Sequence, residues 1–353
     1  MNRLTGFVLA ICLIQPAITV AQETVPAEDT KPTPFVCAPA ATPVITLDHG
    51  SRYVAKDDSR SEFDEASNAD VNAQLAPVDD FITALAKAAN LALDANTDPA
   101  DKTAAADCVL SGLTLWAAAG ALGDLGTMNA QLSSPSRIAG LAFAYAQIQP
   151  LMPASADHDL VEAWLADRAR AIMTYFDTEA PKNASRNNLR AWAALAVARI
   201  GLTVKDDQMI EWADASVRRV ACDAKPDGSL PLEMARKELA LHYQLHAVGP
   251  LVITAALLQK PGEDDLFSAC DGAIHRSVAF VLAAFDDPKL VEQLTGHKQT
   301  YFSGDEDLRG FEIAWAHAYL SLFESPELAE FTKRFGELGN SKLGGRQSLL
   351  WGT

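Results

Sequence analysis

Residues 78–95 have the sequence VDDFITALAKAANLALDA, and this stretch indicates the fold class. Its apolar side chains Ile82, Leu85, Ala89 and Leu93 recur at intervals of three or four residues. That spacing places them on one face of an α-helix. Alanine and leucine, which favour helices over strands, dominate the stretch. It therefore predicts an amphipathic helix.

The same pattern is repeated along the chain toward the C-terminus. Further helices are expected at 108–122, 138–148, 160–175, 189–200, 209–220, 234–258, 266–285 and 311–322. Breakers fall between them at Asp98-Pro99, Ser134-Pro135, Met152-Pro153, Ala180-Pro181, Lys225-Pro226 and Lys260-Pro261-Gly262. No sequence repeat of fixed period and few strand patterns are found. Consecutive helices joined by short links pack as antiparallel hairpins. We therefore expect an all-α fold, an (α/α) toroid or incomplete barrel, with residues 46–353 as one domain.

The N-terminal segment predicts export. Arg3 precedes an apolar run at 7–14, and Thr19-Val20-Ala21 supplies a small residue at the cleavage position. This pattern is typical of a secretory signal peptide, assigned here to residues 1–21. Residues 22–45 are rich in proline and should form an extended arm. No later apolar stretch is suited to span a bilayer, so we expect a periplasmic or secreted protein without membrane insertion.

Four cysteines remain after the signal peptide: Cys37, Cys108, Cys222 and Cys270. An even number in an oxidising compartment indicates up to two disulfides, for which three connectivities are possible. Buried free thiols are the alternative. No spacing of cysteine and histidine indicates a metal site, so no metal is expected.

The formal net charge of the chain is −17, which argues against nucleic acid as a partner. An anionic substrate would require arginines gathered in one groove. Arg52, Arg60, Arg186, Arg190 and Arg236 fall in the three polar segments described next, and we expect them to form a local positive patch.

The first polar segment, residues 183–192, reads NASRNNLRAW. Asn187 or Asn188 could cap the following helix, as asparagine often does. Asn188 and Trp192 are four residues apart and share a helix face, with Arg190 nearby. An amide, an indole and a guanidinium together also suit a binding site for an acidic sugar.

The second polar segment, residues 227–246, reads DGSLPLEMARKELALHYQLH. Arg236 and Tyr243 are seven residues apart, so on one continuous helix they would project from the same face about 10 Å apart. His246 would lie close to that face, and His242 would point away from it. The alternative is that Tyr243 is a core residue. A third segment, Ser51-Arg52-Tyr53 with Asp57 and Arg60, is otherwise an ordinary solvated loop.

Together these segments resemble the alginate lyases, in particular the mannuronate-cleaving family of (α/α) toroid enzymes. The second segment carries the most specific match: Asp-Gly-x-Leu-Pro-x-Glu, then Arg236, then Ala-Leu-x-Tyr243. The first is similar to the family's Asn-Asn-His-Ser-Tyr-Trp segment at Asn187, Asn188 and Trp192. The third is similar to a Ser-Lys-Tyr-x-x-Ser-Asp loop, with Arg52 in place of lysine. Weaker similarities are Cys-x-x-x-x-x-x-Leu-Trp116 and Leu343-Gly-Gly-Arg-Gln, so the resemblance covers about residues 35–350.

The chain departs from the family at two positions. Leu189 stands where the family has a histidine that is a candidate base or a neutraliser of the substrate carboxylate. Leucine can perform neither role. His246 stands where the family tends to carry a tyrosine.

The resemblance implies β-elimination. Asn188 and Arg236 would neutralise the uronate carboxylate, and Tyr243, its phenol pKa lowered by Arg236, would be both base and acid. His246, one turn away, is the competing base. Substrate-binding residues would be Arg52, Tyr53, Arg60, Asn187, Arg190, Trp192 and Lys237. The resemblance also favours a Cys37–Cys108 disulfide, which leaves Cys222–Cys270 by subtraction. No metal or organic cofactor is implied.

We therefore expect a monomeric polysaccharide lyase that cleaves β-1,4-linked polyuronate. Poly-β-D-mannuronate, as in alginate, is favoured and glucuronan is next. Polyguluronate is expected to remain essentially uncut, because Leu189 removes the second base that an anti elimination needs. One alternative is a non-catalytic binder of acidic exopolysaccharide. The other is an (α/α) toroid glycoside hydrolase, which would need two paired carboxylates from among Glu233, Glu312 and Asp305.

Overall fold

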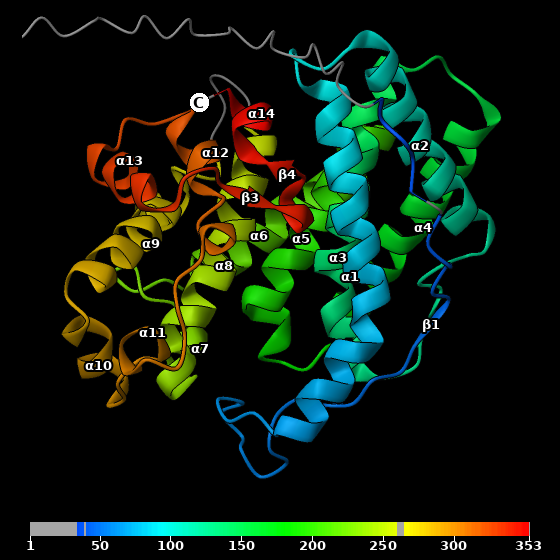
Figure 1. The fold of residues 1–353 in the computed structure, drawn as a ribbon. Helices are drawn as coiled ribbons and strands as arrows, with labels where there is room; N and C mark the ends of the chain where they lie inside the picture. The colour runs from blue at the N-terminus through cyan, green and yellow to red at the C-terminus, as the bar shows by residue number, and fades with distance from the viewer. Residues whose placement is uncertain (1–33, 39, 260–264, 353) are drawn as a thin grey trace, which may run out of the picture. The chain divides into compact units, whose positions relative to one another are not determined.

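The computed structural model describes residues 34–38, 40–259 and 265–352. The predicted signal peptide and the first part of the proline-rich arm lie outside the described residues. Phe35–Thr353 forms one compact unit, drawn in Figure 1, and only this unit is described below.

The unit is built almost entirely from helices. The longer helices are α1 (Glu65–Leu93), α2 (Pro99–Ala118), α3 (Met128–Ile148), α4 (Ala156–Thr178), α5 (Asn188–Val204), α6 (Asp207–Ala221), α8 (Ala240–Leu257) and α9 (Ala269–Asp286). The short helices are α7 (Pro231–Met234), α10 (Lys289–Thr295), α11 (Thr300–Ser303), α12 (Ala316–Leu320), α13 (Pro326–Thr332) and α14 (Gln347–Trp351). The strands among the described residues are β1 (Thr46–Leu47), β2 (Asp124–Leu125), β3 (Gly339–Asn340) and β4 (Gly345–Arg346). The predicted all-α class is confirmed.

Helix α5 lies at the centre of the packing. It contacts α3, α4, α6 and α8, which lie side by side in Figure 1. Its sequence from Ala191 to Ala198 consists of small or apolar residues that are all buried. Because alanine keeps the side-chain layer thin, neighbouring helices can pack against every face of α5. Its N-terminus, at Asn188, reaches the candidate site.

The described part of the N-terminal arm is attached to the helical body. Cys37 and Cys108 form a disulfide, and the backbone N–H of Phe35 donates to Asp101. The strand β1 then pairs in parallel with β2. A second disulfide joins Cys222, after α6, to Cys270 in α9. Both predicted pairings are confirmed.

Two prolines, Pro77 and Pro135, lie inside helices, whereas the sequence pattern predicted that these helices begin after them. Pro135 was expected to break the chain but lies within α3. Its missing N–H leaves the Gln131 carbonyl free, and the Ser134 hydroxyl donates to that oxygen at 3.3 Å. Pro77 lies inside α1, which begins at Glu65. Ala73, whose carbonyl Pro77 frees, is exposed, so water can hydrate that oxygen.

The predicted helix 234–258 is not continuous. After α7 the chain makes a turn at Ala235 and Arg236 and a 3₁₀ turn at Lys237–Leu239 before α8 begins. Lys237 has a φ of 48°, which an α-helix does not allow. The predicted helix 311–322 is likewise reduced to α12. None of the described helices is long and apolar enough to cross a membrane.

Candidate active site

A cavity of about 440 Å³ opens between the loop before α1, helices α1, α3, α5 and α8, and the turn before α8. We call it the basic cavity. It is lined by eight of the predicted site residues: Arg52, Tyr53, Arg60, Asn188, Trp192, Arg236, Tyr243 and His246. Segments far apart in the sequence therefore meet here, as the resemblance implied.

Arg236 covers the ring of Tyr243. Its guanidinium carbon lies 3.5 Å from the centre of that ring and 5.4 Å from the centre of the Tyr53 ring. The Tyr53 and Tyr243 hydroxyls are hydrogen-bonded to each other. Arg236 also donates from Nε to the Arg60 carbonyl at 3.2 Å. The expected separation of two helical turns is wrong, because Arg236 lies in the turn before α8 and folds back over the helix.

The phenol of Tyr243 does not have the lowered pKa that its arginine neighbour suggested. Burial raises the pKa of Tyr243, and the adjacent Tyr53 raises it further. Arg236 lowers that pKa, but not enough to offset burial. The resting side chain is therefore a neutral phenol, which can donate a proton.

Asn188 is held in place by a buried carboxylate. Its backbone N–H donates to Oε1 of Glu233 at 2.8 Å, and its amide donates to Oε2 at 2.9 Å. Glu233 is fully buried, and burial raises its pKa to about 7. The Oδ1 atom of Asn188 has no hydrogen-bond partner among the described residues. The amide thus keeps an unused acceptor, and one of its two N–H groups, for other partners.

Two histidines of α8 enter the basic cavity. The ring of His246 packs against Trp192 with centroids 5.3 Å apart. Burial, with nearby positive groups, lowers the pKa of His246 well below its ordinary value, so the imidazole is neutral. His242 also lines the cavity, and its ring centre lies 5.0 Å from that of Tyr243. The expectation that His242 points away from the site is wrong, because the basic cavity extends along α8 far enough to include both His242 and Tyr243 although adjacent helix residues diverge by about 100°.

Arg137 and Lys342 complete the positive lining, and the sequence interpretation missed both. Each contacts Asp79, Arg137 at 2.6 Å and Lys342 at 3.4 Å. Burial lowers the pKa of Lys342 to about 8. The only available signal was the position of Lys342 directly before the weakly matching segment at Leu343.

Arg190, a predicted binding residue, does not line the cavity. Its side chain is 2% exposed and donates to Ser216 at 2.8 Å and to Asp177 at 2.9 Å. The guanidinium also lies 4.1 Å from the centre of the Trp212 ring. Because Arg190 is two residues after Asn188, it leaves the opposite side of α5. It joins α5 to the helices behind it.

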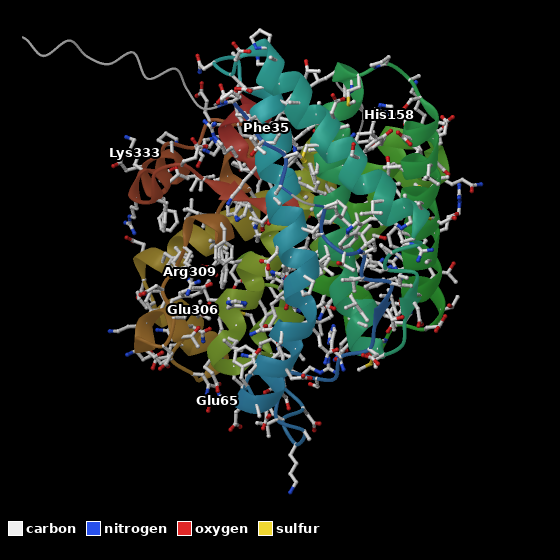
Figure 2. All side chains as sticks on the ribbon, turned by 45° about the vertical axis from the view of Figure 1, so that its right-hand side comes forward. Phe35, Glu65, His158, Glu306, Arg309 and Lys333 are labelled. Atoms are coloured by element: carbon white, nitrogen blue, oxygen red, sulfur yellow. A yellow bond between two sulfur atoms is a disulfide. The ribbon has the colours of Figure 1, made fainter. Side chains whose placement is uncertain are left out.

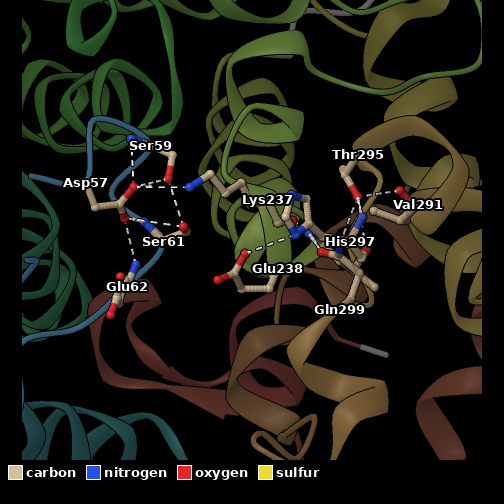
Figure 3. Close-up of polar contacts among 11 residues, drawn as sticks. Asp57, Ser59, Ser61, Glu62, Lys237, Glu238, Val291, Thr295, His297 and Gln299 are labelled. Atoms are coloured by element: carbon tan, nitrogen blue, oxygen red, sulfur yellow. Dashed lines mark hydrogen bonds and ion pairs between the residues drawn. The ribbon is translucent and has the colours of Figure 1, made fainter.

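Three other predicted residues also lie outside the lining. Asn187 caps α5 by accepting from the Leu189 N–H, as the capping alternative proposed. Arg186 is exposed and pairs with Asp223 at 2.8 Å. Lys237 reaches Asp57 at 3.5 Å, which ties the turn before α8 to the loop that carries Tyr53 (Figure 3).

His242, Glu306 and Glu312 form a group whose ligand atoms lie within 4.8 Å of one another, a composition that can bind a divalent cation. Hydrogen bonds already account for this arrangement. His242 Nδ1 lies 2.7 Å from Glu306, and the Tyr301 hydroxyl donates to Glu312 at 2.5 Å. Glu306 is labelled in Figure 2, on the segment between α11 and α12.

A second cavity of about 520 Å³ adjoins the first. Both are lined by Trp192, His242, His246 and Lys342. The additional walls come from α1, α12 and the C-terminal strands β3 and β4. The two cavities therefore form one groove, with the residues around Tyr243 in one half of it.

Comparison with known proteins gives consistent results. A family model described as alginate lyase matches residues 22–291. A polysaccharide lyase of Stenotrophomonas maltophilia (strain K279a) is 35% identical over 228 residues, covering 64% of this chain and 66% of that protein. An alginate lyase of Pseudomonas syringae pv. syringae (strain B728a) is 28% identical over 254 residues, covering 68% and 64%. The matched region thus spans about two thirds of the length of these relatives.

Among solved structures, alginate lyase A1-III from Sphingomonas species A1 superimposes with a TM-score of 0.71 at 22% identity, covering 91% of this chain and 88% of that chain. A variant of alginate lyase A1-III complexed with tetrasaccharide gives a TM-score of 0.72 at the same identity and coverage. This likeness confirms the predicted (α/α) toroid fold.

Proposed function

Because this chain belongs to the alginate lyase family, we propose that it cleaves β-1,4-linked polyuronate by syn β-elimination. Poly-β-D-mannuronate is the favoured substrate, and glucuronan is the next. The carrying observation is the arrangement of Arg236 over Tyr243 in a positively lined cavity of an acidic protein. A tetrasaccharide complex of the structurally similar alginate lyase A1-III supports an oligosaccharide ligand. We further propose that the protein acts as a monomer in the periplasm or outside the cell.

The first requirement is neutralisation of the uronate carboxylate, because the C5 proton is hardly acidic beside a free anion. We assign this to Arg236 and the Asn188 amide, which Glu233 holds in position. Arg52, Arg137 and Lys342 add positive charge to the same cavity. Donors fixed before the reaction stabilise the enolate-like transition state without reorganising.

Proton transfer is assigned to Tyr243. Its phenolate takes the C5 proton, the C4=C5 double bond forms, and the C4–O4 bond breaks with its electron pair moving to O4. The phenol then returns the proton to O4 and the phenolate is regenerated. Arg236 stabilises the anion, since its guanidinium covers the Tyr243 ring and lowers the pKa of the phenol. One residue can serve both steps only when C5–H and O4 lie on the same side of the ring.

This assignment predicts substrate choice. In mannuronate and glucuronate the two groups are syn, whereas in guluronate they are anti and a base on the opposite face is needed. Leu189 lines the cavity where the family histidine is expected, and its side chain cannot accept a proton. Polyguluronate should therefore remain essentially uncut.

The two rival functions are less well supported. A hydrolase needs two carboxylates flanking the bond. Glu233 is fully buried against Asn188, and Glu312 accepts from Tyr301. A non-catalytic binder would share the basic cavity but would release no unsaturated product.

The test is an ultraviolet assay of the purified protein on polymannuronate, polyguluronate, glucuronan and hyaluronan. A lyase creates a conjugated C4=C5 double bond and therefore absorbance, which a hydrolase does not. Absorbance growth with polymannuronate or glucuronan is expected. Binding without product on all four polymers would support the binder, and rapid cleavage of polyguluronate would reject Tyr243 as the sole proton carrier.

A further inference from the structure

The second cavity has a different lining from the basic cavity. Its floor is formed largely by Trp192, Leu245 and Trp315, whose side chains are buried. Phe311 lies at its edge and is 47% exposed, which is unusual for so large an apolar ring. An exposed aromatic ring beside a cavity offers a flat surface for the apolar face of a pyranose.

Positive charge is also available in this cavity. Lys87, on the exposed side of α1, lines it and forms no hydrogen bond or ion pair with any described residue. Lys342 lies at the junction of the two cavities, so a single anionic polymer could contact it from either side. The carboxylate in this lining, Glu312, has a pKa raised by burial and accepts from Tyr301. The lining therefore favours an anionic ligand.

Much of this wall lies outside the family match. Phe311, Trp315 and the strands β3 and β4 follow residue 291, where the family model ends. The family model therefore does not cover this part of the wall, although Lys87, Trp192 and Leu245 lie within the matched residues. The ligand is inferred from the continuity of this cavity with the basic cavity and from its lysines.

We propose that the second cavity binds a further uronate residue of the polymer whose cleaved bond lies at Tyr243. Phe311 packs against the ring of that sugar, and Lys87 and Lys342 attract its carboxylate. This inference rests on the proposed function, because the reacting sugar is placed in the basic cavity. It makes the C-terminal segment a determinant of substrate length and polymer preference.

The experiment compares wild type with Phe311→Ala and Lys87→Ala on oligomannuronates of increasing defined length. Wild-type kcat/KM should rise with length until the second cavity is filled. Each variant should lose about tenfold in kcat/KM on long substrates, mainly through KM, and keep the wild-type value on the shortest cleaved substrate. Lys87→Arg should restore most of the loss. Both side chains reach solvent, so the variants are expected to fold.

Matched controls are Leu294→Ala, which removes an apolar side chain that is also 47% exposed, and Lys182→Ala, which removes an exposed lysine away from the cavities. Neither should change the length dependence. Equal losses at every length, or no loss at any length, would overturn the proposal.

Calorimetric titration of the same oligomers into the Tyr243→Phe protein separates this proposal from the proposed function. Added Phe311→Ala should weaken binding of the long oligomers and leave that of the short ones unchanged. This pattern together with an inactive wild type would reject the lyase and retain the subsite. If the wild type is active but Phe311→Ala leaves the binding of long oligomers unchanged, the lyase is retained and the subsite is rejected.

Discussion

Tyr243 must be deprotonated to take the C5 proton, although its surroundings favour the phenol. Because burial raises its pKa, only a small fraction of the free enzyme carries the phenolate near neutral pH. As long as the pH is below the pKa, the phenolate fraction increases tenfold for each unit by which the pH rises. We therefore expect kcat/KM for polymannuronate to rise about tenfold per unit between roughly pH 7 and pH 9. Initial rates by ultraviolet absorbance in constant-ionic-strength buffers measure this slope.

Substitution distinguishes Tyr243 from its neighbour His246. Tyr243→Phe should lower kcat by about 1,000-fold or more while polymer affinity changes little, since one hydroxyl is removed. His246→Ala should retain substantial activity. If His246 were the base, the profile would be flat above neutral pH, because its lowered pKa leaves it already unprotonated. A flat profile with an inactive His246→Ala protein would reverse the assignment.

Arg190 and Arg52 illustrate how the same side chain serves different purposes. Arg190 is buried and paired with Asp177, so Arg190→Ala should lower the free energy of unfolding by about 3 kcal/mol. The KM of the folded Arg190→Ala protein should stay unchanged. Arg52 lines the basic cavity and donates to Asn68, so Arg52→Ala should raise KM with little effect on stability. Urea unfolding and steady-state kinetics on both variants test the pair; a raised KM for Arg190→Ala would contradict the structural role.

At the scale of elements, Glu233 links α7 to the N-terminus of α5. Its pKa is about 7 in the folded protein, above the ordinary 4.5. Below pH 4.5 the Glu233 carboxyl is protonated in both the folded and the unfolded state, so its shifted pKa does not lower the free energy of unfolding. As pH rises toward 7 the unfolded state ionises first, so the folded state loses about 3 kcal/mol of relative stability. Arg236 and His242 are the charged or titratable groups that oppose this shift.

Glu233→Gln removes that titration but keeps a hydrogen-bonding side chain. The stability of the variant relative to wild type should therefore improve by about 3 kcal/mol between pH 4.5 and pH 8. Urea unfolding at several pH values measures the difference, in which the other ionisable groups largely cancel. Glu324 is exposed and forms no hydrogen bond or ion pair with any described residue, so Glu324→Gln serves as control and should follow the wild type throughout. If the free energy of unfolding of Glu233→Gln had the same pH dependence as that of the wild type, the fold would not destabilise the ionised Glu233 carboxylate.

Sequence periodicity predicted the helices that pack in the core but not their interruptions. Leu85 and Ala89 point inward on α1 because burial selects apolar residues at that spacing. The turn before α8 escaped prediction because nothing local demands it. Its residues contact a loop that is distant in sequence, because Arg236 donates to the Arg60 carbonyl and Lys237 pairs with Asp57.

Site residues were predictable where a motif named them and not where the fold alone brought them in. The segments matching the alginate lyases supplied Asn188 and Tyr243, both in the basic cavity. Arg137 and Lys342 come from elements with no distinctive pattern, and only tertiary packing reveals them. Arg190 was adjacent to a motif and was assigned to the site by proximity in sequence, which a helix does not preserve.

For the whole molecule, the charge in the basic cavity is opposite in sign to the net charge of the chain. The chain carries −17, yet the basic cavity contains Arg52, Arg60, Arg137, Arg236 and Lys342 against Asp79. The expected positive patch is therefore present in a different composition, without Arg186 and Arg190. Such a local field attracts a polyanion over roughly a Debye length, which shortens from about 14 Å to about 4 Å between 0.05 and 0.5 M salt.

We accordingly expect added sodium chloride to raise KM for polymannuronate more than it lowers kcat. The measurement is a kinetic series at fixed pH over that range of salt. Arg60→Ala should reduce the salt dependence, since the Arg60 side chain lines the cavity and pairs with no described residue. A KM that does not respond to salt would reject the local positive patch as a contributor to polymer binding.

The groove has walls of two origins, which bears on how such a protein diversifies. The half around Tyr243 lies mostly within the residues that define the family, and much of the other half comes from the segment after them. A lineage could exchange Phe311 or the β3–β4 segment and adopt a new polysaccharide while its bond-breaking residues stayed as they were. Two descendants with the same reaction could then degrade different polysaccharides. Shared ancestry would indicate the reaction of each protein but not its polymer.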